Sequence, residues 1–210
     1  MRQETSPPDE HNEHDDSDKR NDCTSHGCCV YPHSPMSIVT MILSIITYIL
    51  SQNATWNCYF VQAEFDGGNT IFSDVGRGGN EIKFGLGPFS REDLTEDLSC
   101  ILYSRDDVDS FLDAPYKTSR IFGAFANLLL GIVMIALICT SCMSYYPIVM
   151  KVIGVVSIVG SGCLGMTFFL FSSDLCENCS FHVGAGVAVV GVILALINGV
   201  IVLGLPPSKF

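Results

Sequence analysis

The sequence predicts a membrane α-helical protein: a bundle of four transmembrane helices with a small extracellular or luminal antiparallel β-sheet in its first outer loop. The mean hydropathy is +0.37 with only 16% charged residues. Apolar residues cluster in four runs, each close to the ~20 residues that cross a hydrocarbon core. The long segment after the first run alternates apolar and polar residues between glycine-rich turns, which is typical of short strands.

The first segment is an acidic tail with eight acidic and three basic residues before the first apolar run. Its few aliphatic residues bury too little apolar area to offset the ordering entropy, so we expect it to be disordered. The expected boundaries are 1–35 for this cytosolic tail, 36–54 for the first transmembrane helix, 55–121 for the sheet loop, 122–140 for the second helix, 141–147 for a cytosolic turn, 148–171 for the third helix, 172–182 for the second outer loop, 183–205 for the fourth helix and 206–210 for a short C-terminal tail.

Four stretches of the long loop predict strands. The stretch "WNCYFVQAEFDGG" begins at Trp56 and alternates, as do "EIKFGLGPF" and "SCILYS", while "NTIFSDV" is a weaker example. The turns "DGGN" and "GRGGN" separate them. The stretch "SREDLTEDL" opens with Ser90 and Asp93 in a capping-box pattern, so it predicts a short helical turn.

Two pairs of cysteines lie in the two loops expected on one side of the membrane. Cys58 and Cys100 are the only cysteines of the long loop. We expect them to form a disulfide, with two buried free thiols as the alternative. Cys176 and Cys179 form a CxxC pair in the second loop. A short local disulfide or two unpaired thiols is the expectation there, because a zinc site lacks the remaining ligands.

Disulfides need an oxidising compartment, so both loops are expected to face the outside or a lumen. We therefore expect an integral membrane protein of the plasma membrane or secretory pathway whose N- and C-termini are both cytosolic. Cys28 and Cys29 lie just before the first helix and are candidates for palmitoylation, with idle residues of the tail as the alternative.

No catalytic motif occurs, so we expect no enzyme activity, no cofactor and no metal site. The closely spaced acids of "SRDDVDSFLD" lack the glycine and terminal glutamate of an EF-hand. Nucleic acid is not expected as a partner, because no basic stripe is present. The absence of acidic residues from the four runs argues against a proton pump or secondary transporter.

Polar and small residues within the runs predict close helix packing. Asn127 and Asn198 are expected to form hydrogen bonds between helices. Small residues recur every fourth position and predict packing faces within the bundle or between subunits: Ser157, Ser161 and Gly165; Gly184 and Ala188; Ala195 and Gly199.

These features resemble the claudin superfamily, which includes claudins, peripheral myelin protein and channel auxiliary subunits. The resemblance covers roughly 36–205 and rests on Trp56 after the first helix, on Gly85 and Leu86 within "FGLGPF", and on Arg120 at the outer start of the second helix. It implies an outer β-sheet on a four-helix bundle. It also implies that Trp56 buries its ring against the sheet. We expect this position rather than the alternative, in which Trp56 is an aromatic belt residue at the membrane interface. The chain departs from the family pattern at Gly87, where a second tryptophan is usual, and at Cys58, which lies on the first strand.

Two classes of function follow as expectations. The first is a protein that acts by assembly with itself or another membrane protein in adhesion, barrier formation or membrane organisation. The second is an auxiliary or pore-forming subunit for ion passage, in which an acidic outer loop attracts cations; residues 57–118 carry twelve acidic and five basic residues. Membrane lipid is a partner in both. An apolar fringe on the outer loop favours the first class.

Overall fold

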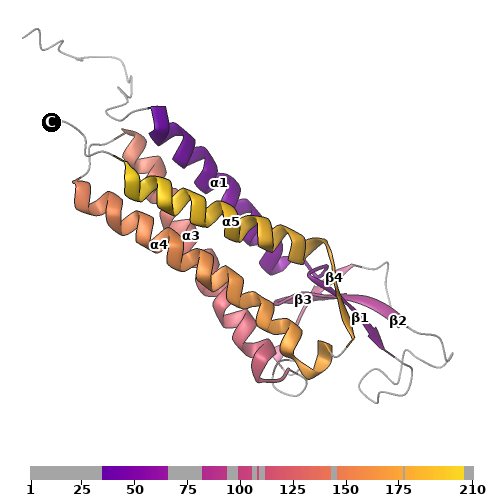
Figure 1. Cartoon of the computed structure of the whole chain (residues 1–210). Helices are drawn as coiled ribbons and strands as arrows, with labels where there is room; N and C mark the ends of the chain where they lie inside the picture. Colours follow the sequence, from indigo (N-terminus) through magenta and orange to yellow (C-terminus); the bar gives the residue numbers. More distant parts are fainter. Residues whose placement is uncertain are drawn as a thin grey trace, which may run out of the picture.

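The computed structural model describes residues 35–65, 82–93, 99–105, 108, 112–142, 146–176 and 178–205. Within these ranges four long helices lie side by side, and a sheet sits at one end of the bundle (Figure 1). We call this end the sheet end. The first helix begins and the last helix ends at the opposite end (Figure 1).

The four helices are each long and apolar enough to span a membrane. They are α1 (Pro35–Trp56), α3 (Ala114–Cys142), α4 (Pro147–Gly165) and α5 (Val183–Gly204). The helix α4 continues into the 3₁₀ helices η2 (Met166–Ser172) and η3 (Asp174–Cys176). The predicted fold class is confirmed, and the protein is an integral membrane protein.

The sheet has five antiparallel strands in the order β4-β3-β2-β1-β5. The strands are β1 (Val61–Phe65), β2 (Ile82–Leu86), β3 (Ser90–Glu92), β4 (Cys100–Leu102) and β5 (Cys179–Phe181). Val61 pairs with Leu86 on one side and with Phe181 on the other. On the far side Leu86 pairs with Arg91, and Ser90 pairs with Leu102.

Two parts of the sheet differ from the sequence prediction. Ser90–Glu92 forms strand β3 and not the start of a helical turn, because its backbone pairs with both β2 and β4. The capping-box pattern is local and carries no information about these neighbours. Strand β5 comes from the second loop, where no strand was expected. The predicted strand "NTIFSDV" lies outside the described residues.

The interface between α4 and α5 explains most of the small residues noted in the sequence. Ser157 Oγ donates to the carbonyl of Ala195 at 3.0 Å, and Ser161 Oγ donates to that of Val192 at 2.9 Å. A Cβ atom on Gly199 would lie 3.0 Å from the Gly154 carbonyl oxygen. These faces therefore pack within the bundle. Gly165 is the exception, because a Cβ atom there would meet nothing within 4 Å.

The helix α1 is polar on its buried face and apolar on its exposed face. Its buried side chains recur every three or four residues: Ser37, Thr40, Ser44, Thr47, Ser51 and Thr55. Its exposed ones include Val39, Ile42, Ile46 and Ile49. Ser51 Oγ donates to Asn127 Oδ1 of α3 at 2.6 Å, as expected for Asn127. The expected bond of Asn198 is not found: its Oδ1 is buried and has no hydrogen-bond partner within the described ranges.

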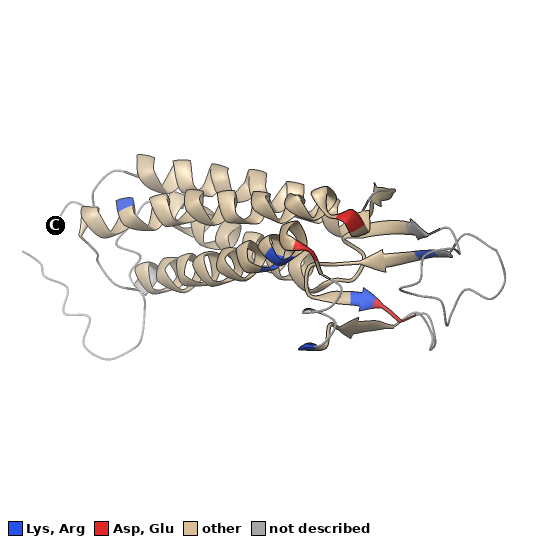
Figure 2. Ribbon diagram, turned by 90° about the horizontal axis from the view of Figure 1, so that it is seen from below, with Lys and Arg blue, Asp and Glu red and all other residues tan. Residues whose placement is uncertain are grey.

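Charged residues of the described ranges gather at the sheet end, and the helices are uncharged over most of their length (Figure 2). Lys151 lies near the start of α4, at the other end of the bundle. Among the described residues, charged side chains therefore lie near the ends of the helices, and most of them lie at the sheet end.

Candidate functional site

The base of the sheet, where strands meet helix ends, brings together most of the residues that the sequence singled out. The chain leaves α1 at Trp56 and crosses one face of β2 before it enters β1. A Cβ atom on Gly85 would lie 2.7 Å from the Cys58 carbonyl oxygen, and one on Gly87 would lie 2.1 Å from that of Asn57. The crossing is possible because neither position has a side chain.

This crossing accounts for both departures from the claudin pattern. The backbone of Asn57 and Cys58 fills the space over Gly87, so a tryptophan has no room at that position. The same path carries Cys58 across the sheet to Cys100 at the start of β4, and the two form a disulfide with Cα atoms 5.6 Å apart. The two departures therefore depend on each other.

Replacing Gly87 with alanine should destabilise the protein by at least about 1–3 kcal/mol, the usual cost of overpacking, because the new methyl group meets backbone that a disulfide restrains. Gly85→Ala should cost less, since its approach is less close. Thermal unfolding in a mild detergent measures both. Gly162→Ala is the matched control, because a Cβ atom there meets nothing within 4 Å. Wild-type stability of Gly87→Ala would contradict the crossing.

The Cys58–Cys100 bridge should matter more than the Cys176–Cys179 bridge of the second loop, whose Cα atoms are 4.8 Å apart. The chain-entropy relation gives roughly 4 kcal/mol for the first, with its separation of 42 residues, and roughly 2 kcal/mol for the second, with a separation of 3. We expect Cys58→Ser and the Cys58→Ser/Cys100→Ser double variant to lose the same stability, because each loses one bond. Unfolding midpoints of the purified variants test this, and additive losses would show that no bridge joins the two residues.

A buried glutamate holds the crossing segment to β2 and β3. Glu92 Oε2 accepts a hydrogen bond of 2.7 Å from the Gly85 backbone amide, and Oε1 accepts one of 3.2 Å from the Tyr59 hydroxyl. Burial raises the pKa of Tyr59, and the negative charge of Glu92 raises it further. Ser90 Oγ donates to the Trp56 carbonyl at 2.7 Å, so the end of α1 is tied to β3. Sequence reasoning missed Glu92, because its role depends on the pairing of β3.

Trp56 does not bury its ring against Gly85 and Leu86, so the expectation from the resemblance is wrong. Helix α1 continues through Trp56, and the ring is 48% exposed. It stacks on Phe89, with ring centroids 4.8 Å apart. The place over Gly85 is taken by the Cys58 backbone. Phe60, next to β1, is fully buried, and the centre of its ring lies 5.6 Å from that of Phe168.

Truncation should therefore cost more at Phe60 than at Trp56. Phe60→Ala removes a side chain with 0% exposure, which typically costs ~3–5 kcal/mol. Trp56→Ala mainly removes a stacked pair at the helix end, worth about 0.5–1.5 kcal/mol. Thermal unfolding of the two variants compares them directly, and an equal or larger loss at Trp56 would restore the buried-anchor hypothesis.

The start of α3 is joined to the second loop by Asp113. Its Oδ1 accepts from the Tyr116 backbone amide at 3.1 Å, which caps the helix, and from Ser173 Oγ at 2.8 Å. Its Oδ2 accepts from the Asp174 amide at 2.8 Å. The buried Tyr116 hydroxyl in turn donates to the Gly87 carbonyl. Both loops are thereby held to the same helix end.

Arg120 lies on α3 beside the base of the sheet. Its guanidinium carbon is 5.1 Å from the centre of the Phe89 ring and 5.6 Å from that of Tyr103. Its Nη1 atom is buried and has no hydrogen-bond partner among the described residues. The Phe89 ring therefore contacts both the Trp56 ring and the Arg120 guanidinium.

The two edge strands of the described sheet, β4 and β5, each expose a large apolar side chain near the helix ends. Leu102 of β4 is 64% exposed, and Phe181 of β5 is 66% exposed. We call Leu102 and Phe181 the apolar rim. Ser90 contacts the end of α1 and pairs with Leu102, while Phe181 is two residues from the start of α5, so the rim lies next to the helix ends.

Cys28, Cys29 and half of "SRDDVDSFLD" lie outside the described residues. The described part of the chain holds no group of three or more side chains suited to a metal ion. No model of a known protein family matches this chain, and no curated protein matches its sequence.

Proposed function

We propose that this chain is a claudin-like membrane protein that acts by lateral assembly, with copies of itself or with another membrane protein, in adhesion, a barrier or membrane organisation. The observation that carries the proposal is the apolar rim. Each of the two edges of the sheet exposes a large apolar side chain against which a neighbouring protein can pack. Both rim residues lie on outer strands, whose free edges among the described strands favour pairing with a neighbour.

The position of the apolar rim along the bundle indicates that assembly is lateral, between proteins in one membrane. Leu102 and Phe181 lie near the helix ends, so they face neighbours in the plane of the same membrane. The two disulfides support a sheet end that faces the outside or a lumen, at the plasma membrane or in the secretory pathway, with the termini in the cytosol. The four-helix bundle with its sheet supports the claudin-like relationship.

The test is the double variant Leu102→Ser/Phe181→Ser, extracted from membranes in a mild detergent. We expect wild-type protein to migrate as an assembly and the variant as a monomer. The unfolding midpoint of the variant should fall only modestly, because both side chains are mostly exposed and the main loss is the stack of Phe181 on Phe171, whose ring centroids are 4.5 Å apart. Tyr146→Ser/Ile148→Ser is the matched control, since it removes exposed apolar residues at the opposite end. Subunit counting by mass photometry or cross-linking in membranes gives the size.

Two outcomes would overturn this proposal. A monomeric wild-type protein in membranes and detergent would remove the assembly. Copurification with a channel that survives the rim substitutions would favour the auxiliary-subunit function instead.

A further inference from the structure

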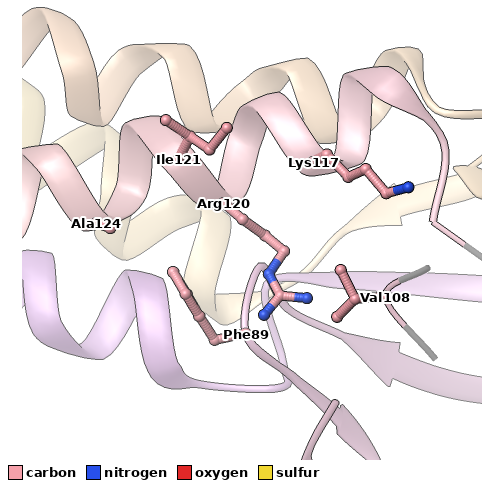
Figure 3. Close-up of a pocket in the computed structure, with 6 residues that line it drawn as sticks. All are labelled: Phe89, Val108, Lys117, Arg120, Ile121 and Ala124. Carbon is pink, nitrogen blue, oxygen red and sulfur yellow. The ribbon is translucent and has the colours of Figure 1, made fainter. Parts of the chain in front are cut away.

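A groove opens beside the base of the sheet where α3 meets the loop that follows β4. It is lined by Phe89, Val108, Lys117, Arg120, Ile121 and Ala124 and has a volume of about 390 Å³. Figure 3 shows the Arg120 side chain reaching down between Phe89 and Val108, while the Lys117 ammonium lies at the rim of the groove and points away from it. This volume is within the usual range of about 300–1,000 Å³ for small-molecule sites.

The chemistry of the groove is divided along α3. Towards the sheet it has two cations, Lys117 and Arg120. Towards the bundle it has Ile121 and Ala124, and the exposed apolar surface of α3 continues through Phe125 and Leu128. A ligand that satisfies both halves is anionic at one end and apolar at the other.

The buried Nη1 of Arg120 requires an acceptor. A buried donor of a charged group that lacks a partner carries a desolvation cost that nothing offsets. The rings of Phe89 and Tyr103 stabilise the guanidinium charge but accept no ordinary hydrogen bond from Nη1. Nη1 itself is closed to solvent, so a ligand meets the guanidinium where Arg120 lines the groove. Arginine binds phosphate oxygens through parallel hydrogen bonds, so a phosphate group suits that side of the guanidinium.

We propose that this groove binds a membrane phospholipid of the leaflet at the sheet end. Its phosphate accepts hydrogen bonds from the Arg120 guanidinium, and the flexible Lys117 adds a second positive charge from the rim. One acyl chain runs along Ile121 and Ala124 into the bilayer. The site holds the lipid between α3 and the base of the sheet, beside Val108.

The test is lipid-dependent thermal unfolding of the delipidated full chain in an uncharged maltoside detergent. The probes are dioleoyl phosphatidylglycerol, dioleoyl phosphatidylcholine, dioleoylglycerol, which lacks the phosphate, and inorganic phosphate alone. We expect the two phospholipids to raise the unfolding midpoint saturably, by about 5–10 °C at ~100 times the dissociation constant. Dioleoylglycerol and inorganic phosphate should leave it unchanged.

Three variants locate the site. Arg120→Gln should raise the phospholipid concentration for the half-maximal shift by at least ~10-fold, because a charged hydrogen bond is lost. Lys151→Gln, the same change of charge at the opposite end of the bundle, should respond as wild type. Ala124→Phe fills the apolar half of the groove on an exposed face of α3 and leaves the charge unchanged. It should weaken the shift of the unfolding midpoint by phospholipid. This variant tests the site even if Arg120→Gln fails to fold.

The proposal is overturned if Arg120→Gln and wild type respond alike, if Ala124→Phe leaves the response unchanged, if dioleoylglycerol is as effective as the phospholipids, or if inorganic phosphate alone produces the shift. Leu102→Ser/Phe181→Ser should retain the full lipid response, because neither residue lines the groove. The proposal of a lipid site and the proposal of an assembly surface can therefore be confirmed or rejected independently.

Discussion

The passage of the Asn57–Cys58 backbone over β2 is the constraint on which the rest of the sheet end depends. Main chain occupies the space where side chains of residues 85 and 87 would lie, so both must be glycine. The groups around this contact are all partnered: the Gly85 amide by Glu92, the Gly87 carbonyl by Tyr116, and Cys58 by Cys100. Because these partners come from β3, α3 and β4, a single close contact sets the positions of three further elements relative to the end of α1.

The packing of the four helices is explained by the lipid that surrounds them. Lipid is as apolar as the helix surfaces, so burial of apolar side chains does not drive the helices together. Close approach and hydrogen bonds take over this role, and the small polar residues of α1 and α4 lie inside while isoleucine and valine face outwards. Most of the buried hydroxyls bond to a backbone carbonyl, either of their own helix, as Thr47 does, or of a neighbour, as Ser157 does. They therefore remain satisfied without water.

The sheet is joined to the bundle at several points around its base. Ser90 bonds to the end of α1, Asp113 joins α3 to the second loop, and the amide of Gly184 in α5 donates to the Tyr59 carbonyl at 2.7 Å. Strand β5 adds the second loop to the sheet, next to β1. With both loops held in this way, the apolar rim and the Arg120 groove keep fixed positions relative to the helix ends.

The sequence by itself determined the four spans, three of the five described strands and the pairing of Cys58 with Cys100, and it left the state of Cys176 and Cys179 open. These follow from local patterns: the length of the apolar runs, the alternation of apolar and polar residues along a strand, and the number of cysteines in each loop. What only the tertiary structure decided depends on distant partners. Ser90–Glu92 became a strand because two neighbours pair with it, β5 formed because β1 offered an edge, and Glu92 gained its role from the Gly85 amide. Trp56 was placed outside the core because the backbone of the next two residues already filled the site over β2, and no local pattern encodes such exclusion of one segment by another.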